Sequence, residues 1–193
     1  MEKSNARKSR SVRRTRRDLR KSLIELMKDK SILHISAKEI YETADIGRTT
    51  FYAHYKDPYN LLEEIEADEM EYVKDLLNRY EHAAKHNNKE MMEIILMVLN
   101  DIAKEGNLLQ VLLSENGNVI FQKRFFNYCI EHIQKIIKSN SNKPDDMYVH
   151  EGYSVFMVNG IIGIIQYWIK NKMHIPINTL AEMILKLIHE VRL

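Results

Sequence analysis

The stretch ISAKEIYETADIGRTTFYAHYKDP, residues 35–58, holds the densest set of local structure signals in the chain. Ser36 and Glu39 have the spacing of a capping box, in which each side chain accepts a hydrogen bond from the backbone N–H of the other residue. Ile35 and Ile40 occupy the two positions of the hydrophobic staple that accompanies such a box. These signals predict that a short helix begins at Ser36.

A tight turn and a second short helix are expected to follow. The first helix should end near Thr43, and residues 44–47 should form the turn. Asp45 tolerates a left-handed backbone, and Gly47 can cap the helix after it. The second short helix is predicted over residues 48–55.

A longer helix is predicted from Asp57 and Pro58, which supply an N-cap and a proline at the first helical position. Leucines and isoleucines at helical spacing carry it to about Tyr80. At the other end of the chain, residues 1–12 are basic and almost without apolar side chains, which predicts a mobile arm. An amphipathic helix is expected from about Arg13, with Leu19, Leu23, Leu26 and Met27 on its apolar face.

Composition favours an all-α fold for the whole chain of 193 residues. With 6 Gly and 3 Pro, the sequence has few turn signals and no strand-like alternation. Charge is unevenly distributed, since residues 1–60 hold 15 Lys and Arg against 8 Asp and Glu, whereas the remainder is acidic. A basic end on an acidic body is typical of proteins that present one end to a polyanion.

Further helices are expected after the helix that ends near Tyr80. Their predicted ranges are 89–104, 108–114, 119–138, 146–171 and 178–191. A single cysteine excludes an internal disulfide, and no apolar signal segment follows the first residues, so a cytoplasmic location is expected. The apolar window 155–169 is shorter than a membrane span and contains polar residues, so it is interpreted as a buried or interface helix.

Two short helices joined by a tight turn and preceded by a basic helix describe a helix-turn-helix motif. Phe51 and Tyr55 lie four residues apart and should face the core, which leaves Arg48, Thr49 and Tyr52 outside, with His54 beside them. Arginine can bond guanine with two hydrogen bonds, threonine can reach a base or a phosphate, and tyrosine and histidine can donate to phosphate. The alternative is an ordinary helical hairpin with a polar surface.

The run from Ile35 to Asp57, with its Thr-Phe-Tyr-x-His-Tyr-Lys-Asp core, resembles the N-terminal signature of the tetracycline-repressor (TetR/AcrR) family. The resemblance covers roughly residues 13–72 and implies a three-helix DNA-binding domain, a linking helix and a larger helical domain for dimerisation and ligand binding. It implies that Arg48, Thr49, Thr50, Tyr52 and His54 lie at DNA-contacting positions, and that Ser36, Lys38 and Lys56 lie at phosphate-facing ones. Three positions depart from the family pattern, namely Asp45, Gly47 and Pro58.

The expected division of the chain is therefore a basic arm (1–12), a helix-turn-helix domain (13–58), a linking helix (59–80) and a regulatory and dimerisation domain (81–193). In the last part, glycines inside an apolar helix indicate the close approach of another backbone. The predicted dimer-interface residues are Gly160, Gly163, Tyr167 and Trp168. The alternative is a tightly packed core within one chain.

A ligand pocket is the usual trigger of the family, and aromatic and sulfur-containing residues are candidates for its lining: Phe125, Tyr128, Cys129, His132, Tyr153 and Phe156. A stripe of this kind is also typical of an ordinary core. Cys129 and His132 could form a thiol switch or could be buried structural residues. His82 and His86 lack the further partners of a diagnostic metal site, so neither a metal nor a cofactor is expected.

The sequence thus predicts a transcriptional regulator that binds a palindromic operator in double-stranded DNA as a homodimer. It is expected to be a repressor, controlled by a small molecule or a partner at the C-terminal domain. The alternative is a DNA-binding co-regulator whose C-terminal domain binds another protein. An enzyme is not expected, because the sequence has no phosphate-binding glycine loop, nucleophile elbow or metal motif.

Overall fold

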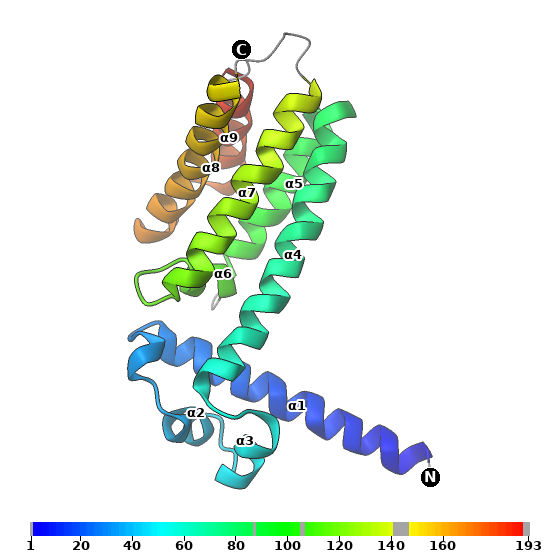
Figure 1. Ribbon diagram of the computed structural model, residues 1–193, viewed down its shortest axis with the longest axis vertical. Helices are drawn as coiled ribbons and strands as arrows, with labels where there is room; N and C mark the ends of the chain where they lie inside the picture. Colours follow the sequence, from blue (N-terminus) through cyan, green and yellow to red (C-terminus); the bar gives the residue numbers. More distant parts are fainter. Residues whose placement is uncertain (1, 87, 105–106, 141–146, 191–193) are drawn as a thin grey trace. The chain divides into compact units, whose positions relative to one another are not determined.

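The computed structural model describes residues 2–86, 88–104, 107–140 and 147–190, and within these ranges it is built of helices with no strand. The prediction of an all-α fold is confirmed (Figure 1). The α-helices are α1 (Glu2–Met27), α2 (Ala37–Thr43), α3 (Arg48–His54), α4 (Pro58–His86), α5 (Asn88–Ile102), α6 (Leu108–Leu112), α7 (Val119–Asn140), α8 (Met147–Lys170) and α9 (Ile177–Glu190). The chain divides into two compact units, the first of residues 1–69 and 111–119 and the second of residues 70–110 and 120–193.

Helix α1 is longer than expected. It begins at Glu2 and not near Arg13, so the predicted start of this helix was wrong. The stretch before Arg13 has no glycine or proline and several good helix formers, among them lysine, arginine and alanine. Low hydrophobicity therefore did not prevent the helix from extending toward the N-terminus.

The capping box at the start of α2 is confirmed in full. The Ser36 hydroxyl accepts a hydrogen bond from the Glu39 N–H at 3.3 Å, and the Ser36 N–H donates to the Glu39 carboxylate at 2.8 Å. A single turn of 3-10 helix, Ile32–His34, precedes α2 and was not predicted. Ser31 is its N-cap, and the Ser31 side chain accepts a hydrogen bond from the Leu33 N–H. Ile35 and Ile40 are both buried, as a staple requires.

The turn between α2 and α3 is a Schellman motif. The Ile46 N–H bonds to the Tyr41 carbonyl at 2.8 Å, and the Asp45 N–H bonds to the Glu42 carbonyl at 3.1 Å. Asp45 has a φ of 53°, which confirms the left-handed backbone expected there. Gly47 then serves as the N-cap of α3 with an extended backbone.

The start of α4 is fixed by its own cap. Helix α4 begins at Pro58, and the Asp57 carboxylate accepts a hydrogen bond from the Asn60 N–H at 2.8 Å. The predicted N-cap and first-position proline are thus confirmed. The helix continues to His86, six residues beyond the expected end near Tyr80.

The core of the first unit is formed by apolar residues of α1, α2, α3 and the first part of α4, namely Leu19, Leu23, Met27, Ile40, Phe51, Tyr55, Leu61, Leu62 and Ile65, which are all at most 2% exposed. The segment of residues 111–119 belongs to this unit. Asn118 donates to the buried Glu66 carboxylate at 2.9 Å, and Asn116 donates to the Lys28 carbonyl at 3.1 Å. Two asparagine side chains therefore attach this later segment to α4 and to the end of α1.

The second unit buries the inward faces of α5, α7, α8 and α9. Helices α5 and α9 pack together, with Leu99 on α5 and Leu180 on α9 almost fully buried. Helix α8 ends in a second Schellman motif, in which the Met173 N–H bonds to the Trp168 carbonyl at 2.9 Å. The Trp168 indole N–H donates to the Ile175 carbonyl at 2.8 Å, which ties the turn to the helix before it.

Candidate nucleic-acid interface

Helix α3 presents a polar outer face over an aromatic inner one. Phe51 is 0% exposed and Tyr55, at the C-cap, is 2% exposed, as expected for the two anchors of this helix. The Phe51 ring lies 6.3 Å from the Tyr41 ring and 6.1 Å from the Tyr55 ring, measured between ring centres. Because α3 spans only seven residues, these buried rings and not its own hydrogen bonds hold it in place.

The outer face of α3 carries most of the residues that were predicted to contact DNA. Arg48, Thr49 and Thr50 are exposed, and the Tyr52 side chain is 50% exposed. The Arg48 guanidinium carbon lies 5.8 Å from the centre of the Tyr52 ring, within the range of a cation–π contact. His54 is half-buried, so it offers less of its surface than the others do.

The residues predicted to face phosphates differ in how free their side chains are. Lys56 is exposed, while the Lys38 ammonium lies 3.8 Å from the Glu42 carboxylate on the same helix. The Ser36 hydroxyl is engaged in the capping box, where it also donates to Glu39 at 2.8 Å. A hydrogen bond from Lys30, followed by those from Ser36, lowers the pKa of Glu39 to about 2. This carboxylate therefore stays ionised and holds the start of α2 at neutral pH.

The six residues predicted to line a pocket do not form one group. Phe125, Cys129 and His132 lie on the buried side of α7, each less than 9% exposed. His132 Nε2 lies 3.1 Å from the Leu77 carbonyl and 3.5 Å from the Glu81 carboxylate, so this ring ties α7 to α4. Burial raises the pKa of the Cys129 thiol to about 12, so the thiol stays protonated and fits the structural interpretation better than the thiol switch.

The other three residues are less buried. Tyr128 and Tyr153 are half-buried, and the Phe156 side chain is 64% exposed on the outer face of α8. Phe156, which was predicted to line a ligand pocket, therefore lies on the exposed side of α8 and not beside the buried residues of α7. Its spacing from Tyr153 suits one helix face only approximately, and sequence alone did not show which side of α8 faces the core.

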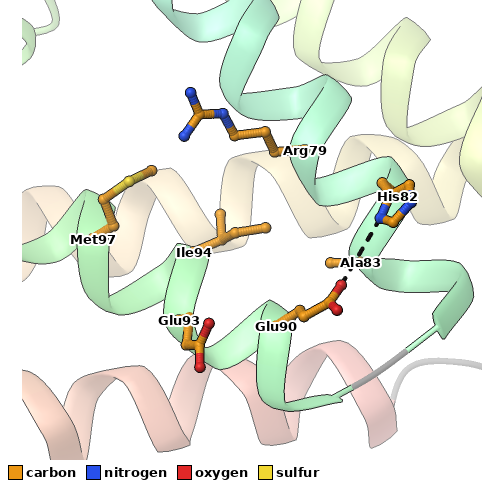
Figure 2. A pocket seen from close by; sticks show the side chains of 7 residues that line it. All are labelled: Arg79, His82, Ala83, Glu90, Glu93, Ile94 and Met97. Carbon is orange, nitrogen blue, oxygen red and sulfur yellow. Dashed lines mark ion pairs between the residues drawn. The ribbon is translucent and has the colours of Figure 1, made fainter.

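Figure 2 shows a pocket that was not predicted from the sequence. Its volume is about 360 Å³. Helices α4 and α5 line it through Arg79, His82, Ala83, Glu90, Glu93, Ile94 and Met97. His82 Nδ1 lies 3.9 Å from the Glu90 carboxylate across it. None of the six predicted pocket residues contributes to this pocket, which is bordered by both acidic and basic side chains.

The four residues predicted for a dimer interface lie on two sides of α8. Tyr167 is 61% exposed and Gly163 is exposed beside it, whereas Trp168 is 1% exposed within its own chain. The prediction that Trp168 is presented on an interface was wrong, because its ring fills the core and its N–H is bonded there. A side chain added at Gly160 or Gly163 would meet nothing within 4 Å, so packing within this chain does not require either glycine.

Comparisons with known proteins agree with this arrangement. A family model described as "Transcriptional regulator C-terminal region" (TetR_C_8) matches residues 89–190. The uncharacterized HTH-type transcriptional regulator YxbF of Bacillus subtilis (strain 168) is 32% identical over 78 residues, which make up 39% of this chain and 20% of that protein. The aligned part of the chain thus spans about a fifth of the length of this relative.

Solved structures share the whole fold. NalD, the secondary repressor of the MexAB-OprM multidrug efflux pump in Pseudomonas aeruginosa, matches with a TM-score of 0.65 at 16% identity, over 94% of this chain and 97% of that one. The transcriptional regulator FadR from Bacillus subtilis, solved in complex with stearoyl-CoA, matches with a TM-score of 0.60 at 13% identity, over 88% of this chain and 95% of that one.

The helices and the helix-turn-helix define the chain as an all-α protein of the transcriptional-regulator class. More specifically, the chain belongs to the TetR family of transcriptional regulators, since the family model covers more than half of it. The resemblance found in the sequence is thereby confirmed.

Proposed function

We propose that the protein is a sequence-specific DNA-binding regulator that inserts α3 into the major groove. The observation that carries the proposal is that Arg48, Thr49 and Tyr52 are exposed on α3, while Phe51 of the same helix is buried in the core. A rigid short helix with outward arginine, threonine and tyrosine has the chemistry to bond guanine, to contact thymine and to reach phosphate. Lys38 and Lys56 supply further phosphate contacts from either side of the motif.

The regulator is proposed to act as a homodimer through α8 and α9. The outer face of α8 presents Val155, Phe156 and Tyr167, and the outer face of α9 presents Met183 and Leu187, all more than a third exposed. Gly160 and Gly163 leave room on α8 for another backbone to approach. Pairing α8 and α9 with their copies about a two-fold axis would bury these residues in a four-helix interface.

A second copy covers this face better than lipid does. By length and composition, the segment Val149–Lys170 is apolar enough to cross a membrane. Its exposed face, however, also carries Asn159 and Gln166. Placing these amides in a bilayer would cost free energy, whereas a protein interface accommodates polar side chains. A two-fold dimer would place two copies of α3 about one DNA turn apart, so the proposal predicts a palindromic operator.

Control of DNA binding is proposed to come from the second unit, in the cytoplasm, by a small-molecule effector and with repression as the outcome. NalD is named as a repressor, and FadR was solved with stearoyl-CoA bound, so regulators of this fold include both a repressor and a ligand-binding protein. The matched proteins are regulators and not enzymes. The competing proposal, a co-regulator whose α8 face binds a different protein, predicts a monomer in isolation.

The experiment is fluorescence anisotropy with a labelled duplex from the region upstream of the protein's own gene and a scrambled duplex of equal length. Wild-type protein is expected to prefer the native duplex at both 50 mM and 200 mM salt. Arg48→Ala and Tyr52→Ala should each lose that preference while keeping salt-dependent binding to the scrambled duplex. Equal binding to both duplexes by all three proteins would reject sequence reading by α3.

A further inference from the structure

Side chains from three helices of the first unit meet at the C-terminal end of α3. Tyr55 contributes a buried ring whose hydroxyl lies 3.3 Å from Arg16 Nε on α1. The same hydroxyl donates to Glu64 Oε1 on α4 at 3.0 Å, and the Arg16 guanidinium pairs with the other oxygen of the Glu64 carboxylate. The tyrosine hydroxyl therefore bonds to both partners of a direct ion pair that joins α1 to α4.

The protonation of this cluster suits its geometry. Burial raises the pKa of Tyr55, so its hydroxyl keeps the proton that it donates to Glu64. The hydrogen bond to Tyr55 is also the largest influence that raises the pKa of Arg16, whose charge is therefore kept. One hydroxyl thus accepts from α1 and donates to α4 at the same time, which fixes the tyrosine ring relative to both helices.

A second ion pair one helical turn further on holds the same two helices without reaching α3. Arg20 pairs with Asp68 and lies 3.6 Å from the Glu64 carboxylate. Helices α1 and α4 would therefore stay together without Tyr55. What the hydroxyl adds is a connection to the recognition helix, at the residue where the chain leaves α3 in an extended conformation (φ −136°, ψ 136°).

We propose that Arg16, Tyr55 and Glu64 form a positioning cluster that sets the direction of α3 for DNA, although none of the three needs to touch DNA. Because α3 has seven residues and Tyr55 is its C-cap, a change in the position of Tyr55 would shift the short helix and the side chains on its outer face. The inference rests on the proposed DNA-binding function. It gives Tyr55, predicted only as a core residue, a positioning role, and it adds Arg16 and Glu64, which lie outside the motif.

The decisive variant is Tyr55→Phe, which removes one oxygen and keeps the buried ring. Without DNA, hydrogen exchange at the Tyr55 amide, which bonds to the Phe51 carbonyl at 2.9 Å, should become about three- to tenfold faster. Exchange at the Ala44 amide, which closes α2 on the Ile40 carbonyl at 3.0 Å, should not change. Affinity for the native duplex should fall about three- to tenfold, while binding to the scrambled duplex keeps its salt slope, since no charge is lost.

Glu64→Gln provides a second route, with Glu63→Gln as its matched control. Both changes remove one negative charge from neighbouring positions on α4, so both raise non-specific attraction to DNA equally. Glu63 is exposed and outside the cluster, so only Glu64→Gln should speed exchange at Tyr55 and reduce the preference for the native duplex. Combined with Tyr55→Phe, Glu64→Gln should cost less than the sum of the two separate losses.

The two readouts separate the two proposals. Unchanged exchange and unchanged duplex preference in Tyr55→Phe would overturn the positioning cluster, as would equal acceleration at Tyr55 and Ala44, which would indicate a general loss of stability. If the wild type shows no duplex preference, the DNA-reading proposal fails, and the exchange measurement still decides whether the cluster holds α3.

Discussion

Helix α3 carries the proposed DNA-reading residues and helix α8 the proposed dimer-interface residues, yet their sequences are informative to different degrees. At α3, the four-residue spacing of Phe51 and Tyr55 predicts the buried side, and the structure buries both and exposes Tyr52 as expected. In α8, apolar residues occur on every side of the helix, and the neighbours Tyr167 and Trp168 are 61% and 1% exposed. A helix with a polar side reveals its orientation in the sequence, whereas a helix that is apolar all round does not.

The largest effects should come from the buried member of each neighbouring pair. Phe51→Ala and Trp168→Ala are each expected to lower the free energy of unfolding by about 3–5 kcal/mol, because each empties a filled core position. Urea unfolding followed by circular dichroism measures the loss. Tyr52→Ala and Tyr167→Ala, the exposed neighbours, should cost less than about 1 kcal/mol at low protein concentration. A comparable loss in both members of a pair would contradict the assigned orientation of that helix.

Association of two copies should depend on the exposed face of α8. Phe156→Ala and Tyr167→Ala are each expected to weaken the dimer about tenfold or more, because large aromatic side chains dominate such interfaces. Sedimentation velocity over a concentration series gives the dissociation constant, with Glu131→Ala on an exposed position of α7 as the control. A wild type that is monomeric at micromolar concentration would instead favour the co-regulator with a different protein on this face.

The capping box at the start of α2 allows a sharper test, because one side chain can be removed from it. Ser36→Ala should lower the free energy of unfolding by about 1 kcal/mol at pH 7, since it removes the hydrogen bond from the Glu39 N–H to the Ser36 hydroxyl. Thermal unfolding of wild type and variant measures this. An unchanged midpoint would mean that the box contributes little to the first unit.

Stability should depend on pH through Glu39, the partner of Ser36 in the capping box. The pKa of Glu39 is lowered to about 2 in the folded chain, so its contribution to stability is present above its ordinary pKa and is lost as the pH falls from about 4.5 to 2. Glu39→Gln should therefore be less stable than wild type at pH 7, and the difference should shrink through this window. Glu42→Gln on the same helix is the control, and a difference that persists at pH 2 would refute the assignment.

The smallest effect on stability is expected at Asp45, in the turn between α2 and α3. Asp45 has a φ of 53°, a region that costs most residues energy and glycine none, so Asp45→Gly should stabilise the chain by up to about 1 kcal/mol. Asp45→Asn, which also tolerates this backbone and removes the charge, separates the conformational effect from the electrostatic one. Destabilisation by glycine would show that the Asp45 side chain makes a contribution beyond its backbone.

Features that depend on neighbours in sequence could be predicted, and those that depend on distant partners could not. The capping box joins residues three apart, and the Schellman turn needs only a residue that tolerates a left-handed backbone. By contrast, Arg16 and Glu64 are separated by 48 positions, and the pairing of Asn118 with Glu66 spans 52. Basic residues one turn apart on α1 were visible in the sequence, but nothing there indicated that they face α4 and not solvent.

The same limit explains the pocket and interface predictions. Phe125, Cys129 and His132 share a face of α7 at helical spacing, and the structure buries that face. Helix α8 has no such division, so Phe156 was placed inside and Trp168 outside, each opposite to its observed position. Long-range packing, which sequence spacing does not encode, determines which of Phe156 and Trp168 is buried.

The central claim is that α3, held by buried rings, reads DNA from its outer face in a symmetric dimer. Hydroxyl-radical footprinting of the wild type on the upstream duplex tests it most directly. We predict two protected patches on one face of the DNA, centred about one helical turn (34–36 Å) or a multiple of it apart, and their loss in Tyr52→Ala. Uniform protection along the duplex, unchanged in Tyr52→Ala, would contradict the claim.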